Sequence, residues 1–259
     1  MEVRTLPRYV HIDDIVIVGT DHRAKVGSTK EKQKFWSEIR SAKHHFTEGY
    51  SRSLEVLNAH KRYAGITYEY LFLNKYGNKI TFLEDNSRWS ELSVRYGIRE
   101  DLFGIYRLMA SGPNILSAAD SIDGVVESLR IGLTIFSKYD SIFVPEYSQS
   151  SVDKFLIVVD ELVALPEDVV TIANVGSEYV NFLREIRDYE VIALKFKKHT
   201  EEMEGKKALV IGDGHVDYIA NYLRNETVEK PKTWQDFVCR LDQNLRDFVY
   251  KVENELFSA

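Results

Sequence analysis

The sequence contains very little cysteine and proline. Cys239 is the single cysteine in 259 residues, which excludes an intramolecular disulfide and a cysteine-rich metal site. A reducing compartment is compatible with this composition. The chain has 5 prolines and no glycine/serine-rich or charge-block segment that would act as a linker. We therefore expect a single α/β domain over residues 1–259.

Long apolar runs and an excess of basic residues are also missing. No run approaches the ~20 apolar residues of a membrane-spanning helix, and the first residues lack the apolar stretch of a secretory signal. The 34 Lys and Arg residues against 40 Asp and Glu residues give a net charge of -6, which argues against a nucleic-acid-binding surface. We expect a cytoplasmic protein that binds neither nucleic acid nor membrane.

Short apolar runs alternate with longer helical patterns along the chain. This alternation is typical of an α/β fold, here with a central, mostly parallel sheet flanked by helices. We expect core strands at residues 15–18, 45–47, 80–83, 141–144 and 208–211. The first and last of these are continuously aliphatic, as strands covered on both faces are.

Helical periodicity places helices between and after these strands. Ser28, followed three residues later by Glu31, forms a capping-box pattern that predicts a helix from residue 28 or 29 to Ala42. A long helix is expected from residue 177 or 178 to residue 204, with Gly205 as its stop.

The last residues form one apolar stripe. The spacing from Trp234 to Leu256 predicts an amphipathic C-terminal helix over residues 233–257, with Cys239 inside it and inert. We expect this helix to pack on its own domain. The alternative is a homodimer seam through residues 234–256.

Polar side chains follow the carboxyl ends of the expected strands, where open α/β sheets bind their ligands. His22 and Glu48 follow the first two strands, and Glu84, Glu146 and His215 follow the others. We interpret Glu146 as a surface group. Glu84 is either a second acidic group that binds substrate in a cleft or an ordinary surface carboxylate.

Both histidines belong to a Gly-x-x-His turn. Gly19 precedes His22, and Gly212 and Gly214 precede His215. Glycine allows a tight turn out of a strand, and a histidine beyond it can bind a metal or act as a base near neutral pH. One such turn arises easily by chance. Two copies after aliphatic strands favour a functional site.

These motifs resemble those of the TraB/Tiki-type proteins. The matching segments are the Gly-Thr-Asp-His turn at residues 19–22, the strand ending in Glu48, the Arg187-Asp188 pair on a helix and the closing strand with its Gly-x-Gly-His turn at residues 212–215. The resemblance covers roughly residues 12–225, which would form the core. It implies the EreA/ChaN-like (Tiki) fold, shared with erythromycin-esterase-like and ChaN-like proteins.

The resemblance also implies several activities. Tiki-type members are metal-dependent hydrolases of peptide bonds, and erythromycin-esterase-like members hydrolyse a lactone with histidine as the base. Other members bind haem or have no settled activity. A shared fold therefore leaves the reaction open.

The hypothesis for this chain is a peptidase- or esterase-like hydrolase acting on a peptide or small-molecule substrate. Its catalytic residues would be His22, Glu48, Arg187 and His215. His22, Glu48 and His215 form a plausible ligand set for Zn²⁺, Mn²⁺ or Co²⁺ with a position open for water. Without a metal, His22 or His215 would activate water directly, oriented by Glu48.

Arg187 would stabilise the developing oxyanion or anchor a substrate carboxylate. The alternative for Arg187 is a surface ion pair with Asp188, Glu190 or Asp217. Two other classes of function remain open for the whole chain. One is a non-catalytic module that binds haem or a small ligand, and the other is a regulatory or interaction protein that works through residues 234–256.

Overall fold

The computed structural model describes residues 7–21, 26–48, 66–83, 89–98, 166–226 and 228–257. The chain divides into two compact units, Met1–Asn86 with Ile186–Lys230 and Ser87–Glu185 with Pro231–Ala259. Each unit combines two stretches that are distant along the chain, and neither is a contiguous piece. The single domain expected from the sequence therefore stays a prediction.

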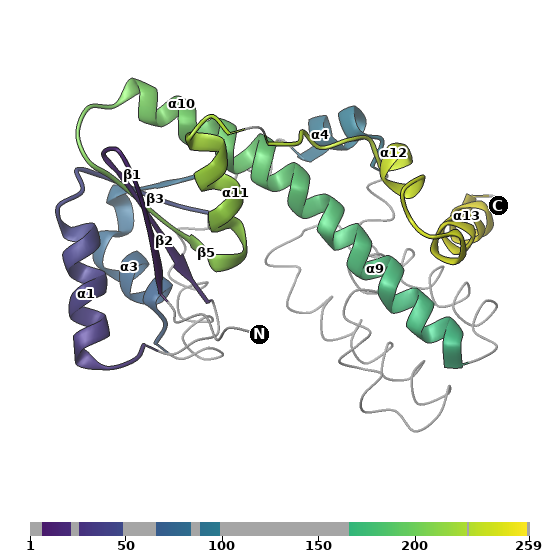
Figure 1. Ribbon diagram of the computed structural model, residues 1–259, viewed down its shortest axis with the longest axis horizontal. Coiled ribbons are helices and arrows are strands. Elements are labelled where there is room, and N and C mark those ends of the chain that lie inside the picture. The colour runs from purple at the N-terminus through teal and green to yellow at the C-terminus, as the bar shows by residue number, and fades with distance from the viewer. Residues whose placement is uncertain are drawn as a thin grey trace. The chain divides into compact units, whose positions relative to one another are not determined.

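The first unit contains a five-stranded, mostly parallel sheet (Figure 1). The strands are β1 (Arg8–Ile12), β2 (Ile15–Thr20), β3 (His44–Thr47), β4 (Ile80–Phe82) and β5 (Lys207–Gly212), in the order β1-β2-β5-β3-β4. Neighbours pair in parallel except β1, which is antiparallel to β2. The α/β class and four of the expected strands are confirmed. The fifth, at residues 141–144, lies outside the described residues.

The edge strand β1 was not anticipated from the sequence. None of its residues is fully buried, and its sequence Arg-Tyr-Val-His-Ile mixes polar and apolar residues. It therefore contains no apolar run that would predict a strand. In contrast, every residue of β2 and β5 is buried, because these central strands are covered on both faces. The aliphatic runs of β2 and β5 follow from that double coverage.

Helices α1 (Thr29–Arg40) and α3 (Tyr68–Tyr76) lie on one side of the sheet, and α11 (Asp213–Leu223) lies on the other (Figure 1). The predicted start of α1 is confirmed, since Ser28 and Glu31 form the full capping box. The helix ends at Arg40 rather than Ala42. Phe35 and Phe72 are fully buried in the core between these two helices and the sheet.

The long helix predicted to start at residue 177 or 178 begins earlier and contains an irregular turn. It consists of α9 (Pro166–Ile186), a π-helical segment η3 (Arg187–Ala193) and α10 (Leu194–Glu202). Proline fits the first turn of a helix because its missing N–H has no partner there. The expected stop is confirmed near Gly205, which has a φ of 96° in the left-handed region.

The second unit contains α4 (Trp89–Tyr96), most of α9, and helices α12 (Trp234–Val238) and α13 (Gln243–Phe257). The prediction of one continuous helix over residues 233–257 is wrong. The helix is interrupted after Val238, and the side chain of Asp242 accepts a hydrogen bond of 3.0 Å from the Leu245 N–H at the start of α13. Cys239 is consequently exposed at the end of α12, not enclosed within a helix.

The apolar side chains of α12 pack against the unit's own α9. The ring of Trp234 lies 5.1 Å from that of Tyr179, and the ring of Phe237 lies 5.0 Å from that of Phe182. This agrees with the expected packing on the parent chain, and the homodimer seam stays a prediction. In the part of the chain that the structure describes, no helix is long and apolar enough to cross a membrane.

Candidate functional site

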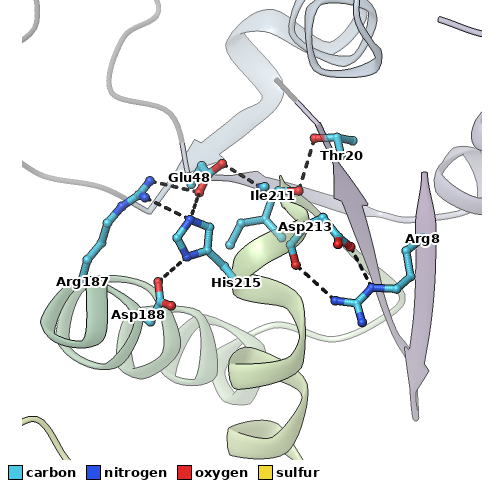
Figure 2. Close-up of polar contacts among 9 residues, drawn as sticks. Arg8, Thr20, Glu48, Arg187, Asp188, Ile211, Asp213 and His215 are labelled. Atoms are coloured by element: carbon cyan, nitrogen blue, oxygen red, sulfur yellow. Dashed lines mark hydrogen bonds and ion pairs between the residues drawn. The ribbon is translucent and has the colours of Figure 1, made fainter. Parts of the chain in front are cut away.

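The candidate site lies where β3 and β5 end. Glu48 directly follows β3, and His215 is the third residue of α11, which directly follows β5. The two strands are parallel neighbours, with Thr47 opposite Val210, so their carboxyl ends meet at one edge of the sheet. Arg187 and Asp188 reach the same place from the π-helical segment (Figure 2).

The structure thus brings together three of the four residues predicted to be catalytic, namely Glu48, Arg187 and His215. His22 and Glu84 lie outside the described residues, so their predicted roles stay predictions.

Glu48 is the most buried of these side chains and both of its oxygens have partners. Its Oε1 accepts a hydrogen bond of 2.8 Å from the Gly212 N–H, and its Oε2 accepts one of 3.0 Å from Arg187 Nη2. The same Oε2 lies 3.6 Å from His215 Nε2. A carboxylate that is 2% exposed needs such partners, because an unpaired buried charge is strongly destabilising.

The imidazole of His215 is approached at both of its nitrogens. Nε2 lies 3.2 Å from Arg187 Nη1, and Nδ1 lies 2.6 Å from Asp188 Oδ1. His215 is 6% exposed and Asp188 is 4% exposed. Asp188 is part of the Arg187-Asp188 motif of the sequence, and in the alternative it is one of the surface partners of Arg187. That alternative is wrong, because Asp188 is buried against His215 and Arg187 pairs with Glu48.

The glycines of the two turns have different roles. A Cβ added at Gly19 would lie 2.6 Å from Asp213 Oδ1 and 2.8 Å from Val216 Cγ2, so only glycine allows α11 to pack this close to β2. Gly212 ends β5 and provides the N–H that Glu48 binds. Gly214 was predicted to lie in the turn, but it is the second residue of α11.

Arg8 on the edge strand β1 binds the first turns of α11. Its Nε donates to Asp213 Oδ1 at 2.8 Å, and its Nη1 donates to Asp217 Oδ1 at 2.7 Å. These contacts explain the two aspartates that follow β5. They hold α11 on the sheet, so Asp217 is not the partner of Arg187.

The described residues do not fit the predicted metal ion. Glu48 and His215 are two of the three predicted ligands, and the guanidinium of Arg187 faces the ligand atoms of both, 3.0 Å from Oε2 and 3.2 Å from Nε2. A fixed cation there repels a metal cation and uses the same lone pairs. Within the described ranges, no three His, Cys, Asp or Glu side chains are grouped to hold a metal.

The chemistry that the described cluster can perform is that of a buried imidazole beside a guanidinium. Histidine exchanges protons near neutral pH, and arginine stays positively charged and donates hydrogen bonds in a fixed fork. Glu48 binds the guanidinium through one oxygen. Its other oxygen accepts from the backbone of β5, which fixes the carboxylate itself.

No protein-family model, curated protein or solved structure matches this chain. The similarity to TraB/Tiki-type proteins therefore rests on the short motifs of the sequence. The general α/β architecture is the part of that expectation which the structure confirms.

Proposed function

We propose that this protein is a hydrolase in which His215 acts as the general base and Arg187 stabilises the oxyanion. The observation that carries the proposal is the partly buried contact of Arg187 with both Glu48 and His215. Arg187 and Glu48 are 139 residues apart in the sequence. Polar and charged side chains that meet at the carboxyl ends of parallel strands are typical of active sites in open α/β sheets.

In this reaction His215 Nε2 takes a proton from water, and the resulting hydroxide attacks the carbonyl carbon of an ester or amide. Arg187 Nη1 donates to Nε2 in the free protein. When water takes that place beside Nε2, the guanidinium is available to donate to the carbonyl oxygen as its negative charge develops. The imidazolium then returns its proton to the leaving alcohol or amine, which restores the neutral base.

Glu48 acts on Arg187 in this scheme. Its Oε2 hydrogen bond orients the guanidinium, while the Gly212 N–H fixes the carboxylate itself. The position of Arg187 supports a route that needs no metal, because the guanidinium supplies the positive charge that a metal would otherwise provide.

The finer fold assignment belongs to the same proposal. The parallel order β2-β5-β3-β4, with Glu48 and His215 at the ends of β3 and β5, supports the EreA/ChaN-like (Tiki) fold. Under this proposal His22, which follows β2 in the sequence, would contribute to the same site, and Glu84, which follows β4 in the sequence, would bind substrate.

The test is a hydrolase screen on the full chain with panels of esters, lactones and peptides. We expect His215→Gln to lower kcat/KM by roughly 100-fold or more, since a general base contributes ~10²–10⁴-fold. His44→Gln is the matched control, because His44 lies on β3 with its ring nitrogen 3.1 Å from the Glu204 carbonyl oxygen, away from the cluster. Equal loss in both variants would contradict the role of His215.

A chelator distinguishes the two hydrolase mechanisms. We expect activity to survive EDTA treatment, and protein purified without chelator to contain no stoichiometric metal. Activity lost to EDTA and restored by Zn²⁺, Mn²⁺ or Co²⁺ would overturn the metal-free route and favour the predicted metal site. A Soret band in the absorbance spectrum, with no turnover on any panel, would favour the haem-binding alternative.

A further inference from the structure

Two consecutive residues approach the two nitrogens of one imidazole ring. Arg187 Nη1 lies 3.2 Å from His215 Nε2, and Asp188 Oδ1 lies 2.6 Å from His215 Nδ1 (Figure 2). In the figure the ring stands between the two side chains, with Arg187 and Asp188 both rising from the same helix. The ring is therefore held from both ends by one segment of the chain.

An ordinary α-helix does not favour this arrangement. With 3.6 residues per turn, neighbouring side chains point ~100° apart, so residues that share a target are normally three or four positions apart. Arg187 and Asp188 open a π-helical turn, in which the Leu194 N–H donates to the Tyr189 carbonyl oxygen five residues earlier. Such π-helical turns are rare in proteins, and many of those that are known lie at functional sites.

The partners determine which nitrogen carries the proton. At Nε2 the two neighbours oppose each other, because the Arg187 guanidinium has donors only and favours a bare nitrogen, while Glu48 Oε2, 3.6 Å away, would accept a proton from it. At Nδ1 the closer Asp188 carboxylate has acceptors only and favours the proton of the neutral ring on that nitrogen. Among the described residues, neither Nδ1 nor Oδ1 has another hydrogen-bonding group to satisfy it, and both atoms are buried.

We propose that Asp188 is a positioning residue, presented by the π-helical turn at residues 187–193, which fixes His215 as the Nδ1–H tautomer. This inference rests on the proposed function, since it makes Nε2 the nitrogen that accepts the proton of water. When Nε2 becomes protonated, the Nδ1–H stays in place and the carboxylate of Asp188 stabilises the positive ring. Arg187 acts on Nε2 and Asp188 on Nδ1, so the two neighbours have separate tasks.

The experiment is ¹⁵N NMR of the full chain with labelled histidine, in which the His215 signals are assigned by their loss in His215→Gln. We expect the wild-type ring at neutral pH to carry its proton on Nδ1. In Asp188→Asn the amide can donate to Nδ1, and we expect the proton to move to Nε2 in part or completely. Asp217→Asn is the matched control, because Asp217 lies on the same helix as His215 and pairs with Arg8.

Kinetics provide the second readout. We expect Asp188→Asn to lower kcat by roughly 100-fold or more with little change in KM, since the general base would be in the wrong tautomer, with a hydrogen on the nitrogen that must accept one. Asp217→Asn should leave both constants and the tautomer unchanged. A wild-type ring with its proton on Nε2 overturns the proposal, whether or not the Asp188 variant folds, and so does an unchanged tautomer in Asp188→Asn.

The two readouts separate this inference from the proposed function. A tautomer that depends on Asp188 in a protein without hydrolase activity would support the positioning role and contradict the hydrolase. Hydrolase activity that depends on His215 while Asp188→Asn retains the wild-type rate would support the hydrolase and contradict the positioning role.

Discussion

Glu48 shows at the residue scale how a single side chain can hold several segments together. Its two oxygens bind the backbone of β5 and the guanidinium of Arg187, so it links the end of β3 to a strand and a helix that are distant in sequence. The position of Glu48 after a strand was readable from the sequence. Its partners were not, because they depend on which strand is the neighbour of β3.

Replacing Glu48 by glutamine tests this linkage. The amide oxygen can still accept from the Gly212 N–H, but the amide nitrogen would face Arg187 donor to donor, and the mostly buried guanidinium would lose the negative charge of Glu48. We expect the free energy of unfolding to fall by about 3 kcal/mol, as for other broken buried ion pairs. Urea unfolding measured by circular dichroism gives this value.

Glu38→Gln is the matched control for that measurement. Glu38 lies 3.3 Å from His11 in a contact in which the histidine side chain is 54% exposed. Exposed ion pairs contribute about 0–1 kcal/mol, so this variant should unfold almost as the wild type does. A similar loss in the two variants would mean that the pairing of Glu48 with Arg187 adds no stability of its own.

At the scale of the elements, the local sequence predicted the start of a helix better than the irregular turns and breaks inside a helical pattern. The capping box of α1 was predicted from two residues and is present in full, since the Ser28 hydroxyl accepts from the Glu31 N–H and the Glu31 carboxylate accepts from the Ser28 N–H. Both capping hydrogen bonds join residues that are three positions apart. The local sequence is therefore enough to predict this helix start.

Ser28→Ala removes one half of this capping box. We expect the free energy of unfolding to fall by about 1 kcal/mol, the usual effect of losing an N-cap side chain. Ser37→Ala, in the middle of the same helix, is the control, because the Ser37 hydroxyl only bonds the Lys34 carbonyl oxygen within the helix. Alanine favours helix interiors, so this second variant should be at least as stable as the wild type.

The π-helical segment and the break after α12 are the element-scale features that were not predicted from the sequence. Both occur inside regular apolar patterns, at residues 187–193 and 239–242. A π-turn adds a residue to a helix without any residue type that marks it. The break after α12 does have a local signal, since Asp242 accepts from the Leu245 N–H at the start of α13 as N-cap residues do.

At the scale of the whole molecule, stability depends on groups that burial forces to stay neutral. His45 on β3 is buried, its ring stacks 3.8 Å from that of Tyr76, and a ring nitrogen lies 3.3 Å from the Ile39 carbonyl oxygen. Burial lowers the pKa of His45 below its ordinary value, because the charged ring would lose its hydration.

This lowered pKa predicts how stability changes with pH. The unfolded histidine binds a proton below pH ~6.5 while the folded one resists it, so the stabilisation is complete above that pH and is lost as the pH falls toward the folded-state pKa. We expect the free energy of unfolding to fall between pH 7.5 and 5.5 through this residue.

His45→Phe should weaken that pH dependence, since phenylalanine can keep the stacking on Tyr76 without titrating. Urea unfolding of both proteins at several pH values measures the difference. An identical slope for wild type and variant would assign the pH dependence to other groups. His11→Gln provides a comparison at a histidine whose side chain is 54% exposed.

The sequence by itself determined the α/β class, four strands of the sheet, the capped start of α1 and the polar residues at the strand ends. These features depend on the spacing of apolar side chains and on contacts within a few residues. The tertiary structure alone decided that β5 lies between β2 and β3, which brings Glu48 to Gly212 and His215. It also placed Asp188 against His215, because only the π-turn and the packing of its helix on α11 bring these two residues together.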